Sequence, residues 1–521
     1  MKNKKLLKYG ILTVAAVSLI SCGGGGGGSS SGGGSTPGEK EFLYYTSSVY
    51  LVDKDNLTSK FKVFDKSVIS TETLFSVSSL DENTGSYSGL KPYQAFFISE
   101  EDNDVSSRNG GKIYKLLLSS PNSSNPVPQQ ITSISDACDF KDFYDDILNK
   151  KAYFVVQTAG DDGLCDSSDD GEVFISSDMN STDSGITGKK VINSIQVFEG
   201  STVEGFIVKE GTELKKCNTD LSECETLLSN VNDVKKIVKQ PGEKNVYYCI
   251  LTSEDTQGHI YEFNGSSLNA LSYSCDTTEE YTGEADEQAY YFEDNGKLKK
   301  FVFSSNSVET VYDVGTSFDI KALTKNYVVI KKGYDILAIK KDGSNNYTLV
   351  NGNTAFAFYI LPIGTKVIFN EIFKNNGSPA GMKACYWEEG GSVNCSPENS
   401  KWVGLSIPEN GNVSFNSSLS IPVYKLMRVE GANFEPYFKM KGGTLKSIKV
   451  SDMSTERILG NVPNDFDLSI TVGIGSKTLV EGIDYGHNCK KDIFFVDVDE
   501  NNSLQNITNT PDEDEESPFS Y

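Results

Sequence analysis

Residues 246–263 read VYYCILTSEDTQGHIYEF and show the unit that this chain repeats. The apolar run from Val246 to Leu251 predicts a buried strand, and a polar loop follows it. Gly258 opens a second run of β-type residues that ends at Phe263, which predicts a second strand. The two strands and their loop are therefore expected to form a hairpin.

An apolar strand followed by a loop and a second strand recurs eight times between Phe42 and Tyr386. The first strands of the eight copies are expected at 42–45, 95–98, 152–155, 205–208, 246–251, 289–292, 327–330 and 366–369. Their spacing averages in the mid forties, which is typical of the four-stranded blades of a β-propeller. In the fifth copy the other two strands are expected at 267–272 and beyond it. We predict an all-β propeller of about seven to eight blades, because eight copies exceed what a β-sandwich needs.

The repeat resembles the strand pairs of lipoprotein and periplasmic propellers over most of the chain up to about Leu405. It lacks the Trp-Asp dipeptides of WD repeats. Trp387 and Trp402 are also too few for the recurrent tryptophans of quinone-cofactor propellers. The resemblance therefore implies an architecture and no cofactor of that kind. The best short stretch with helical spacing is 231–238.

The N-terminus predicts an exported lipoprotein. Residues 1–21 combine lysines with an apolar run at 11–20 that is too short to span a bilayer, as in a signal peptide. Leu19-Ile20-Ser21-Cys22 resembles the lipobox of bacterial lipoproteins, which implies cleavage before Cys22 and acylation of that cysteine. Gly23 in place of aspartate favours the outer membrane, with the protein facing the periplasm or the cell surface. An ordinary secretory signal is the alternative.

Four segments are expected after the signal peptide. Residues 22–38 form a tether of Gly and Ser behind the lipidated cysteine, because a chain with almost no side chains cannot build a core. The propeller is expected over 39–419. Strand-like stretches at 420–505 predict either a small C-terminal β-sandwich or strands that close the ring. The acidic tail at 506–521 is predicted to be disordered.

The chain is strongly acidic, with 48 Lys and Arg residues against 72 Asp and Glu residues and a formal net charge of −24. Removal of the four lysines in the signal peptide leaves 44 basic residues and a charge of −28. Because such a surface repels phosphate backbones, binding to nucleic acid is not expected. The expected partners are the membrane, through the lipid anchor, and an unidentified protein or glycan.

The loops between paired strands differ in length. They are extended in copies two, three, five and eight, which predicts insertions on one rim of the propeller. Three of these loops are acidic. Their carboxylates are Glu100, Glu101, Asp102 and Asp104, then Asp161, Asp162, Asp166, Asp169, Asp170 and Glu172, then Glu254 and Asp255. This rim is the expected contact surface.

The third loop contains a partial match to a calcium loop. Asp166, Ser168 and Asp170 fall at ligand positions one, three and five, Gly171 follows, and the Glu172 carbonyl would be the next ligand. Ser177 stands at position twelve, where an EF-hand has glutamate, so a solvated acidic loop is the alternative. A weaker fragment lies at 497–501. Calcium is the only cofactor that the sequence suggests.

Nine cysteines follow Cys22, and eight of them are near neighbours in sequence. In an exported protein this spacing predicts local disulfides, which are expected to join Cys138–Cys165, Cys217–Cys224, Cys249–Cys275 and Cys385–Cys395. Metal-thiolate sites are the alternative, but the chain has no CxxC motif. Cys249 lies inside a strand and could instead be a buried thiol. Cys489 is left over.

Motifs for catalysis are scarce. The only histidines are His259 and His487, and neither belongs to a nucleophile motif. The sequence has no phosphate-binding loop and no HExxH. We therefore predict a membrane-anchored binding or scaffolding lipoprotein rather than an enzyme. An exported glycan-active hydrolase that uses carboxylates on the rim and a surface adhesin are the alternatives.

Overall fold

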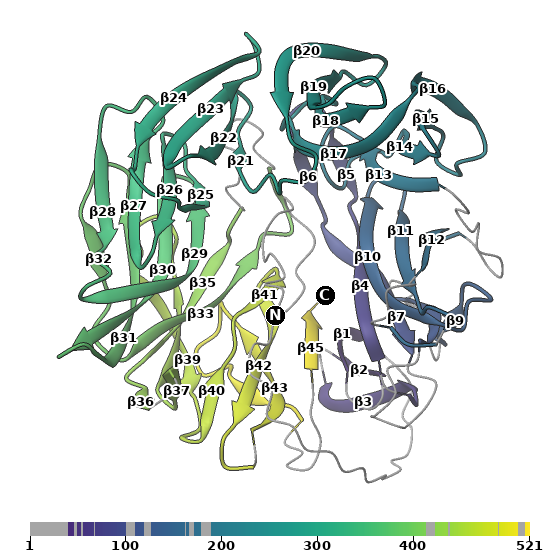
Figure 1. The fold of residues 1–521 in the computed structure, drawn as a ribbon. Helices are drawn as coiled ribbons and strands as arrows, with labels where there is room; N and C mark the ends of the chain where they lie inside the picture. The colour runs from purple at the N-terminus through teal and green to yellow at the C-terminus, as the bar shows by residue number, and fades with distance from the viewer. Residues whose placement is uncertain are drawn as a thin grey trace.

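The computed structural model describes residues 40–45, 49–53, 56–66, 68–99, 110–118, 127–161, 163–165, 171–178, 189–412, 422–435, 438–487, 489–508 and 516–520. Their regular elements are β-strands, arranged as a ring of small twisted sheets (Figure 1). None of the described residues forms a helix that could span a bilayer. The signal peptide, Cys22 and the tether lie outside the described residues.

All eight predicted strand pairs are confirmed as antiparallel pairs. Their first strands are β1 (Lys40–Tyr45), β7 (Lys91–Ser99), β11 (Lys151–Thr158), β14 (Gly205–Glu210), β18 (Val246–Thr252), β22 (Ala289–Asp294), β26 (Tyr327–Lys332) and β30 (Lys366–Asn375). Their partners are β2 (Val49–Asp53), β8 (Lys112–Leu117), β12 (Gly171–Ser176), β15 (Glu213–Cys217), β19 (Gly258–Phe263), β23 (Lys297–Val302), β27 (Asp335–Lys340) and β31 (Ser378–Glu388).

Further strands flank these pairs and complete the sheets. The strands that precede a pair are β4 (Val68–Ser76), β10 (Ala137–Asp146), β13 (Lys189–Ile195), β17 (Val231–Lys239), β21 (Glu284–Ala285), β25 (Asp319–Leu323) and β29 (Ala355–Ile363). Those that follow are β3 (Asn56–Phe64), β9 (Gln129–Gln130), β16 (Cys224–Leu228), β20 (Leu268–Cys275), β24 (Ser307–Asp313), β28 (Asn346–Val350) and β32 (Val393–Cys395). Most of the preceding strands contact the preceding strand of the next sheet, so they form the inner side of the ring (Figure 1).

The short stretch with helical spacing at 231–238 is not a helix, because these residues form the inner strand β17. The expectation of two further strands after 263 in the fifth copy is also wrong, because β17 supplies one of them from before the pair. Only β20 follows there, and the fourth strand of the sheet comes before the pair. The architecture of an all-β propeller is confirmed, with four strands in most of its sheets.

Consecutive sheets pack face to face through their middle strands. Tyr247 and Tyr248 of β18 are neighbours in the chain, and both are almost completely buried. Because side chains alternate between the faces of a strand, Tyr247 packs on the following sheet, with 5.1 Å between its ring centroid and that of Phe301. Tyr248 packs on the preceding sheet, in one cluster with Ile207. Burial of each such side chain contributes about 1.5–3 kcal/mol, which explains why this strand is apolar on both faces.

Two further sheets lie between the eighth sheet and the first. One contains β33 (Ser400–Ile407), β35 (Lys425–Glu430), β38 (Thr444–Ile448), β39 (Thr455–Asn461) and β41 (Thr471–Ile474). The other contains β40 (Phe466–Leu468), β42 (Lys477–Asp484), β43 (Lys490–Asp497) and β44 (Gln505–Asn506). One apolar cluster joins Met382 of the eighth sheet to Val403 and Val480, and another joins Ile493 to Val52 of the first sheet. These clusters complete the ring.

The last strand, β45 (Glu516–Ser520), pairs antiparallel with β1 and lies beside it in Figure 1. The first sheet therefore has the order β3-β2-β1-β45 and joins the two ends of the chain. The prediction of a disordered tail is wrong for 516–520. An acidic segment cannot build a core of its own. The edge of β1 nevertheless offers backbone N–H and C=O groups with which residues 516–520 can pair.

Candidate functional site

The turns that join the two strands of each predicted pair all lie on one side of the ring, here called the loop rim, because strand direction alternates within each sheet. Two of these connections are long. β7 ends at Ser99 and β8 begins at Lys112, and β11 ends at Thr158 while β12 begins at Gly171. The acidic residues between these strands lie mostly outside the described residues. The loop rim is thus where the ring tolerates insertions.

The extended loop predicted in copy eight is wrong. β30 continues to Asn375 and β31 begins at Ser378, so that Asn376 and Gly377 alone make the turn. Their φ angles are +50° and +81°, as a two-residue hairpin turn of type I′ requires, and Asn-Gly is the sequence that favours this turn. The apolar run at 366–369 marked only the buried half of a longer strand.

The predicted calcium ligands Asp166, Ser168 and Asp170 lie outside the described residues. Glu172 lies in β12, where its carboxylate forms an ion pair with Lys141 of β10, the strand on the other side of β11 in the same sheet. The disulfide between Cys138 and Cys165 ties the base of the same loop to β10, with 5.4 Å between the two Cα atoms. The calcium site remains a prediction.

Calcium is expected to raise the melting temperature of the protein by a few degrees relative to excess chelator. A ligand present at about 100 times its Kd stabilises the folded state by about 2.7 kcal/mol. The double variant Asp166→Asn/Asp170→Asn should lose this shift, and Asp313→Asn on the outer strand β24 should keep it. Differential scanning calorimetry measures the effect. Equal melting temperatures of the unmodified protein in calcium and in chelator would rule out the metal.

The carboxylates of the second acidic fragment, at 497–501, accept hydrogen bonds from other groups of the protein. The Asp499 carboxylate accepts a hydrogen bond from the Tyr424 hydroxyl at 2.5 Å and lies 3.8 Å from the Lys425 ammonium. The Asp497 carboxylate accepts from the backbone N–H of Asp499 at 3.0 Å. These carboxylates therefore stabilise the turn after β43.

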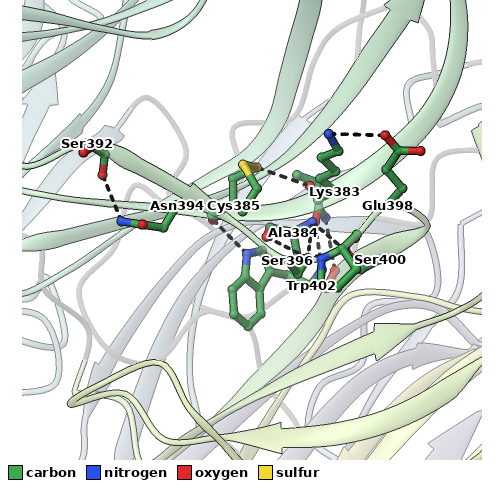
Figure 2. Close-up of a disulfide and its surroundings, with 12 residues drawn as sticks. Lys383, Ala384, Cys385, Ser392, Asn394, Ser396, Glu398, Ser400 and Trp402 are labelled. Carbon is green, nitrogen blue, oxygen red and sulfur yellow. Dashed lines mark hydrogen bonds and ion pairs between the residues drawn. A yellow bond between two sulfur atoms is a disulfide. The ribbon is translucent and has the colours of Figure 1, made fainter.

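The four disulfides join the cysteine pairs that the sequence predicted. Figure 2 shows Cys385 on β31, which is bonded to Cys395 on β32. Glu371 brings a carboxylate within 4.8 Å of these two sulfurs, but sulfurs in a disulfide are not thiolate ligands for a metal. Within the described residues Cys489 is the cysteine outside these four disulfides.

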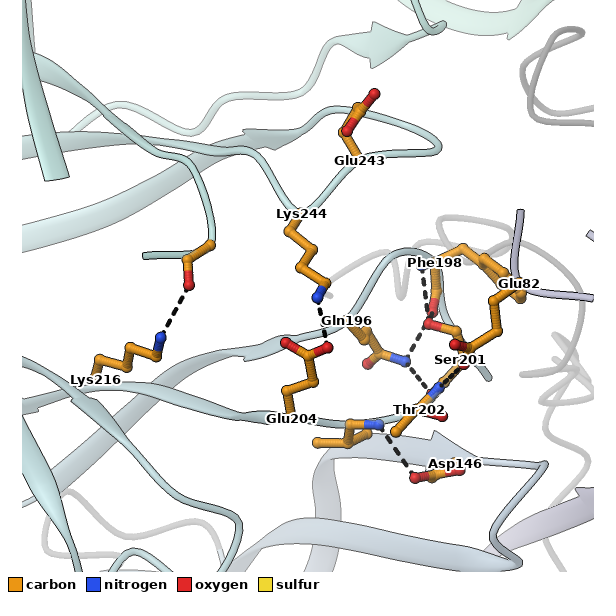
Figure 3. A network of polar contacts seen from close by, with 12 residues as sticks. Glu82, Asp146, Gln196, Phe198, Ser201, Thr202, Glu204, Lys216, Glu243 and Lys244 are labelled. Atoms are coloured by element: carbon orange, nitrogen blue, oxygen red, sulfur yellow. Dashed lines mark hydrogen bonds and ion pairs between the residues drawn. The ribbon is translucent and has the colours of Figure 1, made fainter. Parts of the chain in front are cut away.

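A hairpin inserted between β4 and β7, here called the crossing hairpin, connects distant sheets on the side opposite the loop rim. Its strands are β5 (Ser79–Asp81) and β6 (Ser86–Ser88), and β6 pairs with β34 (Gly411–Asn412). The Tyr87 hydroxyl donates to the Pro408 carbonyl at 3.1 Å. At the other end, the Glu82 carboxylate accepts from the backbone N–H of Thr202 in the fourth sheet at 2.7 Å (Figure 3).

The turn between β13 and β14, which receives the crossing hairpin, is built from hydrogen bonds between side chains and backbone (Figure 3). Gln196 donates to the carbonyls of Phe198 at 2.8 Å and Ser201 at 3.3 Å. The Ser201 hydroxyl also donates to the Phe198 carbonyl, at 2.7 Å. Asp146 at the end of β10 accepts from the backbone N–H of Val203 at 3.1 Å. The turn is therefore held in one conformation by β10 and by its own side chains.

Three ionisable groups beside this turn have strongly shifted pKa values. Burial raises the pKa of Asp145 to about 6, and burial, with the Asp145 charge nearby, raises the pKa of Glu199 to about 8. Burial lowers the pKa of Lys239 to about 7. Its amine donates to three backbone carbonyls at 2.5–2.8 Å, which favours the charged form.

The stability of the protein is expected to fall as the pH rises from about 5 to about 8. A carboxyl whose pKa is raised by folding holds its proton more tightly in the folded state, so stability is lost between its unfolded and folded pKa values. For Glu199 that interval runs from 4.5 to about 8. Glu199→Gln should flatten the decline in melting temperature, and Glu225→Gln on the exposed strand β16 should not. An unchanged slope in Glu199→Gln would contradict the assignment.

Sequence reasoning missed Asp145, Glu199 and Gln196 altogether. Each is an isolated polar residue in a chain with 72 acidic residues, and none belongs to a motif. What distinguishes them is their place where β10 and β17 meet the β13–β14 turn, with Asp145 and Gln196 buried and Glu199 partly buried. This meeting point depends on the order of the sheets. No local signal in the sequence carries that information.

No family model matches the chain, and no curated protein matches it. Among solved structures, a dihydro-heme d1 dehydrogenase is 12% identical with a TM-score of 0.35, and the match covers 70% of this chain and 74% of that one. Dipeptidyl peptidase 4 of Porphyromonas gingivalis is 7% identical with a TM-score of 0.39, over 80% and 65% of the two chains. TolB of Acinetobacter baumannii is 13% identical with a TM-score of 0.23, over 62% and 78%. Similarities of this size assign neither a family nor a function to the chain.

Proposed function

We propose that the protein is an exported, lipid-anchored β-propeller that binds a protein or glycan of the cell envelope through its loop rim. The observation that supports this most directly is the position of its two long acidic connections, between β7 and β8 and between β11 and β12, on the same side of the ring. Loops held by a rigid scaffold are where binding residues concentrate in proteins. The ring itself is closed and densely packed, which suits a scaffold.

The lipid anchor is proposed from the lipobox resemblance at Cys22 and from the Gly/Ser tract that follows it. Each methylene of an acyl chain that enters the bilayer contributes about 0.8 kcal/mol, so several chains on one residue give a durable attachment. We expect Cys22→Ser to abolish incorporation of labelled palmitate and to move the protein from the membrane fraction to the soluble fraction. Retention of label in Cys22→Ser would contradict the proposal.

Crosslinking in intact envelopes followed by affinity capture tests the binding role. The test variant replaces the acidic residues of the two long connections by Asn and Gln. The control variant, Glu223→Gln/Glu225→Gln, alters the exposed turn between β15 and β16, which points to the side opposite the loop rim. We expect the test variant to lose its captured partner and the control to keep it. Protease treatment of intact cells shows in the same experiment whether the partner lies inside or outside the outer membrane.

Loss of the partner in both variants, or in neither, would contradict binding through the loop rim. A hydrolytic activity on envelope glycans that a single carboxylate substitution abolishes would favour the hydrolase instead. The variants for that assay replace the carboxylates of the loop rim one at a time. Glu199→Gln, on the side opposite the loop rim, is tested beside them, because a carboxyl that holds its proton near neutral pH is suited to act as a general acid.

A further inference from the structure

Three aromatic rings from three different segments form a row at the loop rim. Tyr334 lies in the turn between β26 and β27, Phe356 lies at the start of β29, and Phe438 lies between β36 (Asn433–Glu435) and β37 (Lys439–Lys441). The ring centroids of Tyr334 and Phe356 are 6.1 Å apart, and those of Phe356 and Phe438 are 5.5 Å apart. We call these residues the aromatic row.

The two outer rings of the row are exposed. Tyr334 has 61% of its surface exposed and Phe438 has 45%, whereas Phe356 packs against the apolar cluster below. Phe438 also has a φ of +64°, in the left-handed region that costs an L-residue roughly 1–2 kcal/mol. The chain thus holds an apolar ring at the surface in a strained conformation. Exposed apolar patches rimmed by polar groups mark sites of interaction on soluble proteins.

Polar groups border the row on the side of Tyr334. The Lys374 ammonium lies 4.9 Å from the centroid of the Tyr334 ring and 5.8 Å from that of Phe356, and it donates to the Gly352 carbonyl at 2.8 Å. The Asp335 carboxylate accepts from the backbone N–H of Gly352 at 2.7 Å. A Cβ at Gly352 would lie 2.7 Å from the Cβ of Tyr334, so only glycine permits this position of the ring. A donor and an acceptor therefore stand next to exposed aromatic surface.

We propose that the aromatic row binds a neutral saccharide, an inference that rests on the proposed binding function and names its ligand class. One face of a pyranose ring presents C–H groups that pack on an aromatic ring, and its edge carries hydroxyls that both donate and accept hydrogen bonds. Lys374 and Asp335 supply the complementary groups. A net charge of −24 disfavours an anionic ligand, and the Lys374 ammonium already occupies the place that a cationic ligand would take against the rings.

A proline-rich peptide is the competing occupant, because such segments also dock on aromatic surfaces. Its prolines offer carbonyl acceptors but no N–H or O–H donors, so the Asp335 carboxylate would gain nothing from it. A saccharide satisfies both Lys374 and Asp335. The observations therefore favour the saccharide.

Isothermal titration calorimetry with cellohexaose, chitohexaose and maltohexaose tests the proposal, with decaproline as the competing probe. We expect the full-length protein to bind at least one hexasaccharide with a Kd in the millimolar range or below. Tyr334→Ala and Phe438→Ala should each weaken binding at least tenfold. Tyr424→Ala, which removes an aromatic side chain of 38% exposure just before β35, should leave the Kd unchanged. Thermal melting of each variant checks that it is folded.

Absence of binding to all three hexasaccharides would overturn the inference, and so would equal weakening by Tyr424→Ala. Binding of decaproline alone, lost in Tyr334→Ala, would also overturn it in favour of a peptide ligand. These outcomes are separate from the proposed function, because capture of an envelope partner through the acidic connections does not depend on the aromatic row.

Discussion

A variant that ends at Thr508 is expected to unfold at a markedly lower temperature than the full chain and to aggregate at lower concentration. It loses β45, the strand that pairs with β1 and lies beside β42. Each backbone hydrogen bond contributes about 0.5–1.5 kcal/mol, so the loss should be on the order of 3 kcal/mol or more. The open edge of β1 can then pair with another molecule. Urea denaturation and light scattering measure the two effects.

The matched control keeps β45 and changes only its connection. Replacement of residues 509–515 by a Gly/Ser segment of equal length should leave stability within about 0.5 kcal/mol of the full chain. Addition of a peptide with the sequence of 509–521 to the truncated protein should restore part of its stability. Identical unfolding curves for the truncated and full chains would show that β45 does not close the ring.

Asn370→Leu should destabilise the protein by about 3–5 kcal/mol, through the loss of a link between two sheets. Asn370 of β30 is completely buried, and its amide donates to the Trp402 carbonyl of β33 at 3.1 Å. Its side-chain oxygen accepts from the Trp402 backbone N–H at 2.8 Å. Leucine fills a similar volume but leaves a buried donor and a buried acceptor unpaired, each of which costs about 1–3 kcal/mol. Urea denaturation followed by tryptophan fluorescence measures the change.

Asn394→Leu is the control, since Asn394 is exposed on β32 and donates only to the nearby Ser392 carbonyl (Figure 2). Its stability should stay within about 0.5 kcal/mol of that of the unmodified protein. If Asn370→Leu unfolds at the same urea concentration as the unmodified protein, the two sheets do not depend on this amide.

The eight hairpins could be predicted because each is local, with an apolar strand, a turn and a second strand inside one short stretch. β17 could not be predicted as a strand, and the reason is physical. Val231, Val234 and Val238 are its buried valines, at spacings of three and four that imitate a helix. Register shifts in the pairing with β18, at 231–233 and at 236–238, place these residues on the buried side of a strand. The spacing of apolar residues in the sequence does not reveal where a strand contains a bulge.

The remaining features depend on partners that are distant in sequence. β45 is a strand because the edge of β1 is available, and its own composition gives no sign of this. Asp145 and Glu199 come together because the end of β10 meets the β13–β14 turn. The cysteine pairs were predictable for the opposite reason, since each joins residues at most 27 positions apart in neighbouring or adjoining segments.

The crossing hairpin has a consequence for the order of folding. Tyr87 and Pro408 are 321 residues apart in the chain, so their contact closes one of the longest loops in the protein. Contacts of high sequence separation form slowly, because the entropy of loop closure is lost before any bond is gained. Phe75 and Val77 share an apolar cluster with Trp402 and Leu405 of β33, so their burial is complete only once β33 has folded. A chain that is made from its N-terminus is therefore expected to keep these residues partly unburied until β33 has been added.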